Sequence, residues 1–145
     1  MNSKNKFYDL DLSWINNIQV NLSAVERRTL SLVKRRSVKK EYQAAWLLKA
    51  VTLIDLTTLS GDDTFGKVDR LCQKALNPIS EKILNEMNLT SSINVGAVCV
   101  YHHLVKQAKK NLNDKIPIAA VSTGFPAGLS SFSSRKKEIL DSINE

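Results

Sequence analysis

Residues able to do chemistry follow three short apolar segments of the sequence. They lie at Asp55–Thr58, Cys99–His103 and Ser122–Gly128. In parallel α/β proteins, reactive groups sit where strands end and loops begin. These three places are therefore the candidates for a functional site.

Asp55 and Cys99 are the strongest single candidates. Asp55 directly follows an apolar segment, so we expect its carboxyl group to be partly buried. Burial raises the pKa of a carboxyl group and a nearby cation lowers it, so Asp55 could act as an acid, a base or an acceptor for a hydroxyl-bearing substrate. It could equally brace its loop by accepting backbone N–H bonds. Cys99 has neighbours typical of a strand, which favours a buried structural thiol over a nucleophile.

The other polar residues give weaker signals. His102 and His103 are adjacent, which is poor spacing for one metal site, and a third and fourth ligand are missing. We therefore expect no metal. The Gly-Phe-Pro-Ala-Gly run at 124–128 matches neither the Walker loop nor the Gly-x-Gly-x-x-Gly pattern. Its glycines predict a rigid turn with unusual backbone angles or close approach of a ligand, and they signal a phosphate nest only weakly.

The spacing of apolar residues predicts the elements that position these groups. Helical spacing predicts helices, with Asn77 as N-cap and Pro78 as first residue of one of them, and short apolar runs predict buried strands. The order implies parallel strands with right-handed crossovers, in a sheet that is covered on both faces. The expected helices lie at 22–33, 40–49, 65–75, 77–87, 104–112 and 131–143, and the expected strands at 51–54, 95–101 and 116–121.

The length and composition limit the fold and the partners. A closed (β/α)8 barrel takes about 250 residues, so 145 residues hold about three such units and form either a small open sheet or part of a barrel. The net charge is +7, but no aromatic residues interleave with the basic ones, which favours a solvated helix surface over nucleic-acid binding. No apolar run approaches the roughly 20 residues of a membrane span, and residues 1–11 lack the apolar core of a secretory signal. We expect a cytoplasmic protein whose Cys72 and Cys99 stay reduced.

Several stretches, taken jointly, resemble the eukaryotic-type deoxyribose-phosphate aldolases. They run in the family's order across nearly the whole chain. They are residues 10–15 (Leu-Asp-Leu-Ser-Trp-Ile), 18–21 (Ile-Gln-Val-Asn), 38–52, 54–64 (Ile-Asp-Leu-Thr-Thr-Leu-Ser-Gly-Asp-Asp-Thr), 97–101 (Ala-Val-Cys-Val-Tyr) and 123–128 (Thr-Gly-Phe-Pro-Ala-Gly).

This resemblance implies an incomplete TIM (β/α)8 barrel. About three βα units at 50–145 would follow a helical N-terminal extension at 1–49. It also implies a class I aldolase that cleaves 2-deoxy-D-ribose 5-phosphate to D-glyceraldehyde 3-phosphate and acetaldehyde in deoxyribonucleotide catabolism. The family works through a lysine Schiff base and needs neither metal nor other cofactor. Its small-molecule partner is a phosphorylated sugar.

The resemblance assigns substrate-binding residues but no catalytic residue. Asp55 and Thr57 match the family's pocket pair after the first strand, and Cys99 matches the pocket cysteine of the second. The adjacent His102 and His103 depart from the family's proline-containing continuation. The family's Lys-Thr-Ser-Thr-Gly run, its second lysine and its catalytic aspartate have no counterpart here, so we expect this chain alone to be inactive.

An alternative is a non-catalytic interaction protein that reuses the half-barrel. It would pair with the missing barrel half or form a homo-oligomer, because an uncovered edge strand exposes unpaired backbone groups. A weaker third reading is nucleic-acid binding through the basic residues of the helical leader, which would be sensitive to salt.

Overall fold

The computed structural model describes residues 9–35 and 37–145. The chain divides into two compact units, one up to Lys39 and the other from Lys40 to Glu145. The boundary thus falls between residues 39 and 40 rather than between 49 and 50. The helix that begins at Lys40 therefore belongs to the unit that contains the sheet.

The first unit contains two helices, α1 (Ser13–Asn16) and α2 (Leu22–Arg35). The side-chain oxygen of Asn21 accepts a hydrogen bond from the N–H of Ala24 at 3.0 Å, which caps the start of α2. The helix predicted at 22–33 is confirmed and continues to Arg35. Neither helix has a buried residue, so the apolar side chains of α2 are exposed.

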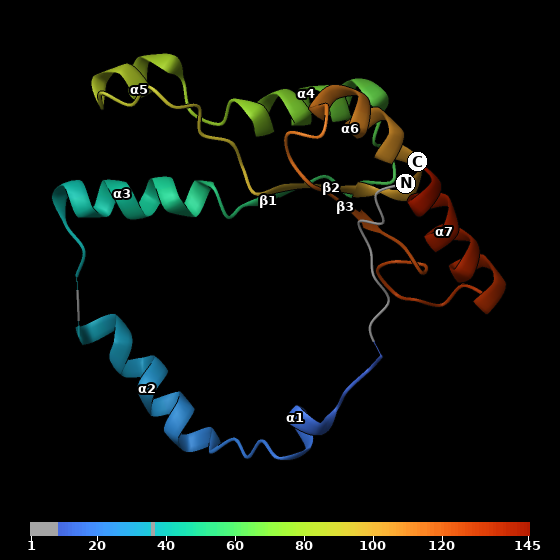
Figure 1. Ribbon diagram of the computed structural model, residues 1–145, viewed down its shortest axis with the longest axis horizontal. Coiled ribbons are helices and arrows are strands. Elements are labelled where there is room, and N and C mark those ends of the chain that lie inside the picture. Colours follow the sequence, from blue (N-terminus) through green and yellow to red (C-terminus); the bar gives the residue numbers. More distant parts are fainter. Residues whose placement is uncertain (1–8, 36) are drawn as a thin grey trace. The chain divides into compact units, whose positions relative to one another are not determined.

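The second unit alternates strands and helices, as the apolar periodicity predicted (Figure 1). Each of its strands is followed by at least one helix. Its elements are α3 (Lys40–Val51), β1 (Asp55–Thr57), α4 (Phe65–Leu76), α5 (Glu81–Glu86), β2 (Ala97–Tyr101), the 3-10 helix η1 (His102–Leu104), α6 (Val105–Leu112), β3 (Ile118–Val121) and α7 (Phe132–Asn144).

The three strands form one parallel sheet in the order β1-β2-β3. Thr57 of β1 lies beside Cys99 of β2, and Cys99 lies beside Ala119 of β3. The predicted parallel pairing is therefore confirmed. Since all three strands run the same way, their carboxyl ends lie along one edge of the sheet.

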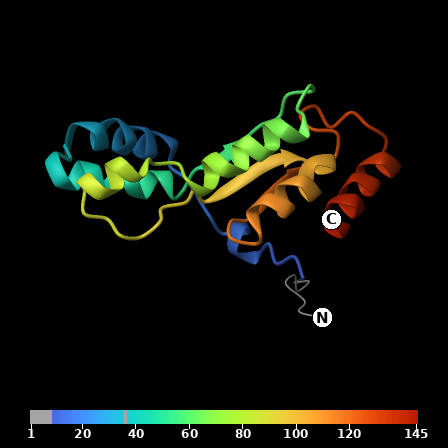
Figure 2. The same ribbon diagram turned by 90° about the horizontal axis from the view of Figure 1, so that it is seen from above.

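Helices α4 and α6 pack side by side over one face of this sheet (Figures 1 and 2). Val98 and Val100 of β2 point toward the helices and are fully buried. Their partners in the core come mainly from α4, α6 and the segments that flank them: Val68, Cys72, Ala75, Val95, Leu104, Val105, Ala108, Leu112 and Ile116. The expectation that both faces would be covered is wrong for the described residues, because no helix of this unit packs on the opposite face.

The first strand begins later in the chain than the sequence predicted. The run 51–54 was expected to be the strand, but α3 continues to Val51, and the N–H of Ile54 still donates to the carbonyl of Val51 at 3.2 Å. A short apolar run fits the end of a helix as well as a strand, and here α3 ends at Val51 and a hydrogen-bonded turn leads to β1. Gly96 packs against this turn so closely that a Cβ there would lie 2.8 Å from the carbonyl oxygen of Thr52.

Asn77 ends a helix instead of starting one. Its N–H donates to the carbonyl of Gln73 at 3.0 Å, which closes α4. Ser80 is the N-cap of the following helix, α5, and Pro78 lies in the connection between the two. The predicted Asn-Pro start is therefore wrong, since the amide of Asn77 completes the last turn of the preceding helix.

Candidate functional site

Asp55, Thr57 and Cys99 lie on one face of the sheet. Thr57 and Cys99 are partners in adjacent parallel strands, and Asp55 is two residues before Thr57 on the same strand. Side chains alternate between the faces of a strand, so all three point to the same side. Val98 and Val100 point to the opposite side, into the helix-covered core. The three candidates therefore lie on the face that no helix of this unit covers, with Asp55 at the start of β1, Thr57 at its end and Cys99 in the middle of β2.

The environments of these three side chains differ. Asp55 is exposed, which corrects the expectation of partial burial: it lies on an edge strand with no helix over it. The Thr57 hydroxyl donates to the backbone carbonyl of Asp55 at 3.0 Å. Cys99 is buried, with 7% of its surface exposed. Burial, and to a smaller extent the charge of Asp55, raise the pKa of the Cys99 thiol. A hydrogen bond from the Thr57 hydroxyl lowers this pKa, but the net shift is upward. The thiol is therefore protonated near neutral pH and is a poor nucleophile.

A carboxylate not singled out from the sequence fixes the loop after β1. The side chain of Asp63 is 1% exposed and accepts hydrogen bonds from the Thr58 hydroxyl at 2.9 Å and the Ser60 N–H at 3.0 Å. The Lys67 ammonium lies 2.6 Å from it. Burial favours the neutral acid, but Lys67, Thr58 and Ser60 together hold the pKa of Asp63 below its usual value. Loop bracing, which we considered for Asp55, is thus performed by Asp63.

Aromatic rings gather at the carboxyl end of β2. The ring of Tyr101 stacks on that of His103 with their centres 6.1 Å apart, and the rings of His102 and His103 meet edge to face at 5.6 Å. Tyr101 is two residues after Cys99 and so shares its face of the sheet. Within residues 9–35 and 37–145, no three His, Cys, Asp or Glu side chains are arranged to hold a metal ion.

The turn after β3 is held by α7. Thr123, Gly124 and Gly128 have positive φ angles, and the N–H of Gly128 donates to the carbonyl of Gly124 at 2.8 Å. The N–H of Gly124 donates to the carboxylate of Glu138 at 2.9 Å. A Cβ at Gly124 would lie 2.5 Å from the Ser130 hydroxyl oxygen. The expected rigid turn is therefore present. The amide that a phosphate nest would have offered is already bound by a carboxylate.

No described lysine lies on a strand or directly after one. Lys49 is in the last turn of α3, and Lys115 precedes β3. The nearest lysine in sequence after β1 is Lys67, which is in α4 and pairs with Asp63. Within the described residues, no lysine lies on these strands, and the Lys67 amine beside the loop after β1 is already paired with Asp63.

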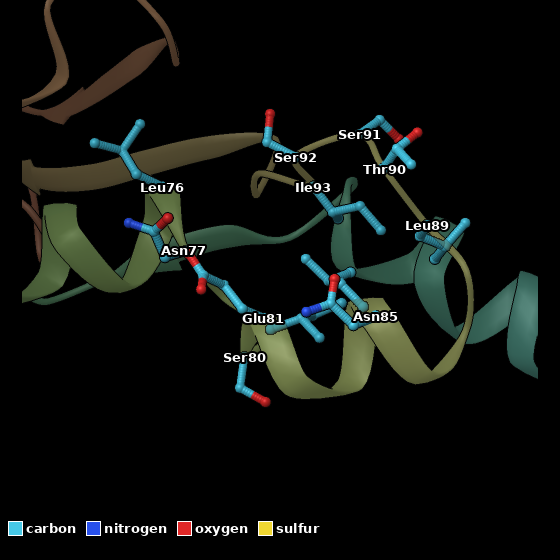
Figure 3. A pocket seen from close by; sticks show the side chains of 12 residues that line it. Leu76, Asn77, Ser80, Glu81, Asn85, Leu89, Thr90, Ser91, Ser92 and Ile93 are labelled. Carbon is cyan, nitrogen blue, oxygen red and sulfur yellow. The ribbon is translucent and has the colours of Figure 1, made fainter.

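A separate cavity of about 570 Å³ lies between α5 and the segment that leads to β2 (Figure 3). This end of β2 is opposite to the carboxyl edge. Glu81 is its only charged lining residue. The other lining residues are neutral: Leu76, Asn77, Ile79, Ser80, Leu84, Asn85, Leu89, Thr90, Ser91, Ser92 and Ile93.

Comparisons with known proteins agree on one family. The chain is 56% identical over 135 residues to the deoxyribose-phosphate aldolase of Mus musculus and 52% identical over 143 residues to that of Homo sapiens. The chain is related to the deoxyribose-phosphate aldolases. These matches cover 90% and 96% of the chain but only 42% and 45% of the two relatives, so the chain spans less than half of their length. No family model matches it.

A solved structure assigned to the deoxyribose-phosphate aldolases supports the fold. That protein, from Coccidioides immitis, matches 75% of this chain and 35% of its own with a TM-score of 0.51 at 21% identity. The likeness shows the α/β arrangement with its parallel sheet. None of the helices described here is long and apolar enough to cross a membrane.

Proposed function

We propose that this chain supplies the first βα units of a deoxyribose-phosphate aldolase barrel. The observation that carries the proposal is the placement of Asp55, Thr57 and Cys99 on one uncovered face of β1 and β2, with Thr57 at the carboxyl end of β1. In TIM barrels this face points into the barrel, and the active site is built at the carboxyl ends of the strands. The identity to the aldolases of mouse and man supports the same placement.

In this proposal the three residues hold and orient the sugar phosphate. The exposed Asp55 carboxylate accepts a hydrogen bond from a substrate hydroxyl or from a water that relays a proton. Thr57 is the strand partner of Cys99, and its hydroxyl donates to the backbone carbonyl of Asp55, so it fixes the spacing of the two groups. Cys99 supplies a neutral, buried wall of the pocket, as its raised pKa requires.

The chemical step needs an amine that this segment does not provide. An aldolase of this kind cleaves 2-deoxy-D-ribose 5-phosphate through a lysine Schiff base, which withdraws electrons from the bond that breaks. No described lysine lies on a strand, and Lys67, beside the loop after β1, is paired with Asp63. We therefore propose that the reactive lysine and its proton-transfer partners come from the remainder of a full-length barrel and that this chain alone is inactive.

A chimera tests the proposal. This chain replaces the matched segment of the mouse relative, and cleavage of 2-deoxy-D-ribose 5-phosphate is followed for the chimera and for the isolated chain. We expect activity only in the chimera. The variant Asp55→Ala should lower its kcat/KM about tenfold or more, the loss typical of one hydrogen bond to a charged group. The exposed neighbour Asp62→Ala is the matched control and should stay within about twofold.

The same experiment decides against the alternative of a non-catalytic interaction protein. A folded but inactive chimera, or an active chimera that is indifferent to Asp55→Ala, would contradict the proposed role of this face. Activity of the isolated chain would contradict the assignment of the lysine to another segment.

A further inference from the structure

A basic cleft lies beside the free edge of β1. Its volume is about 490 Å³. Four of its residues recur at helical spacing on one side of α4, and Asp69, on the other side of that helix, accepts hydrogen bonds from Gln107 and Asn111 of α6. The cleft therefore lies on the side of α4 that faces away from α6. It is lined by Thr57, Thr58, Lys67, Arg70, Leu71 and Lys74.

The charges of the cleft are unbalanced. Lys67 is paired with Asp63, but within residues 9–35 and 37–145 neither Arg70 nor Lys74 forms an ion pair. Arg70 is close enough to Lys67 to oppose its protonation. Leu71 lies between these cations and is only partly buried against the core. The surface thus offers an apolar floor with a rim of positive charge.

The position of the cleft indicates what covers it. β1 pairs with β2 on one side only, so its other edge presents unpaired backbone groups in the described sheet. Closing a parallel barrel adds a strand at such an edge, and the helix of that unit then packs beside α4, over the cleft. The curated relatives are more than twice as long as the segment they share with this chain, so they contain enough residues for such a unit.

We propose that the cleft between β1 and α4 docks an acidic helix from the closing unit of the barrel, with an apolar residue on Leu71 and carboxylates beside Arg70 and Lys74. This inference rests on the proposed function, which requires a completed barrel. A second copy of the chain is a poor occupant because it carries a net charge of +7. Residues 1–39 are also a poor occupant, because they contain more basic than acidic residues.

Charge reversal tests the docking in the chimera with the mouse relative. The variant Arg70→Glu/Lys74→Glu is compared with a control of the same charge change, Lys82→Glu/Lys110→Glu, whose residues are exposed on α5 and α6. Thermal unfolding of both is measured in the chimera and in the isolated chain, at low and at high salt. We expect the cleft variant to lower the Tm of the chimera by roughly 4 °C more than the control at low salt. Salt should shrink this difference, and the isolated chain should show none.

Three results would overturn the proposal. The first is a chimera that unfolds at the same temperature with either variant, or that does not fold at all. The second is an equal loss in the isolated chain, which would make the basic residues part of its own stability. The third is saturable stabilisation of the isolated chain by inorganic phosphate that Arg70→Glu/Lys74→Glu abolishes, which would make the cleft a small-anion site. A folded chimera with the expected Tm pattern but no aldolase activity would leave the docking intact and contradict only the proposed function.

Discussion

Replacing Asp63 with alanine should lower the free energy of unfolding of the chain by about 1–4 kcal/mol. The carboxylate joins three groups, and each responds differently to its loss. The Lys67 side chain is 42% exposed and the Ser60 N–H is also at the surface, so water replaces their bonds at a cost of about 0–1 kcal/mol in all. Thr58 is only 8% exposed, so its hydroxyl would be left without an acceptor, which costs about 1–3 kcal/mol.

Urea unfolding followed by far-UV circular dichroism measures this loss. Asp62→Ala is the matched control, because Asp62 is the exposed neighbour in the same loop and should change the free energy of unfolding by less than about 0.5 kcal/mol. If Asp63→Ala is no less stable than Asp62→Ala, the buried carboxylate does not hold the loop after β1, and our account of that loop is wrong.

The pH dependence of the stability of a third variant, Asp63→Asn, checks the electrostatic part of this reasoning. The pKa of Asp63 is lower in the folded chain than its usual value of 3.8, so its stabilising effect is fully present above that value and is lost as the pH falls through the folded pKa. The difference in unfolding free energy between the wild type and Asp63→Asn, which cannot titrate, should therefore shrink on acidification below about pH 4. A difference that grows on acidification would refute the direction of the shift.

Two further predictions concern the other candidate loops and the thiol. Gly124→Ala should destabilise the chain by about 1–3 kcal/mol in urea unfolding, because φ at Gly124 is +72° and the new Cβ would meet Ser130. The control Gly61→Ala, which has open space around its Cβ, should cost less than about 0.5 kcal/mol. Equal effects of the two variants would contradict the strained turn. At neutral pH, Cys99 should react with iodoacetamide much more slowly than a free cysteine, and the reaction should become faster only in alkali, because burial raises the pKa of the thiol. Peptide mass mapping identifies the labelled residue. Rapid labelling of Cys99 at neutral pH would argue against a buried, protonated thiol.

The alternation of strands and helices and the parallel pairing of the strands followed from the sequence, but the single layer of helices did not, since both faces of the sheet were expected to be covered. The apolar run at 97–101 predicted a buried strand and the helical spacing of Val68, Cys72 and Ala75 predicted an amphipathic helix, and the structure packs the valines of β2 beneath α4 and α6. Periodicity could not place β1. Residues 51–54 are too short a run to distinguish a helix end from a strand, and the backbone hydrogen bonds of Thr52, Leu53 and Ile54 make them the end of α3 and the turn that follows it.

The candidate site was predictable in its residues but not in its support. Asp55, Thr57 and Cys99 could be named from the apolar runs that precede or surround them and from the family resemblance, yet their common face depends on the register between β1 and β2, which one sequence does not determine. Asp63 was missed although a signal existed: it stands three residues after Ser60 and directly before Thr64, the N-cap of α4. An aspartate at such a position often accepts local N–H bonds, and its burial follows only from the fold.

The bond between Glu138 and the Gly124 amide makes the turn after β3 and the helix after it a single unit. α7 begins at Phe132, and Glu138 lies nearly two turns into it. One residue inserted or deleted between them rotates Glu138 by about 100° around the helix axis and carries its carboxylate away from the amide. Ordinary surface loops accept changes of length, but here a change of length would have to fall outside residues 124–138. Related chains should therefore vary in length beyond this interval and keep it constant within it.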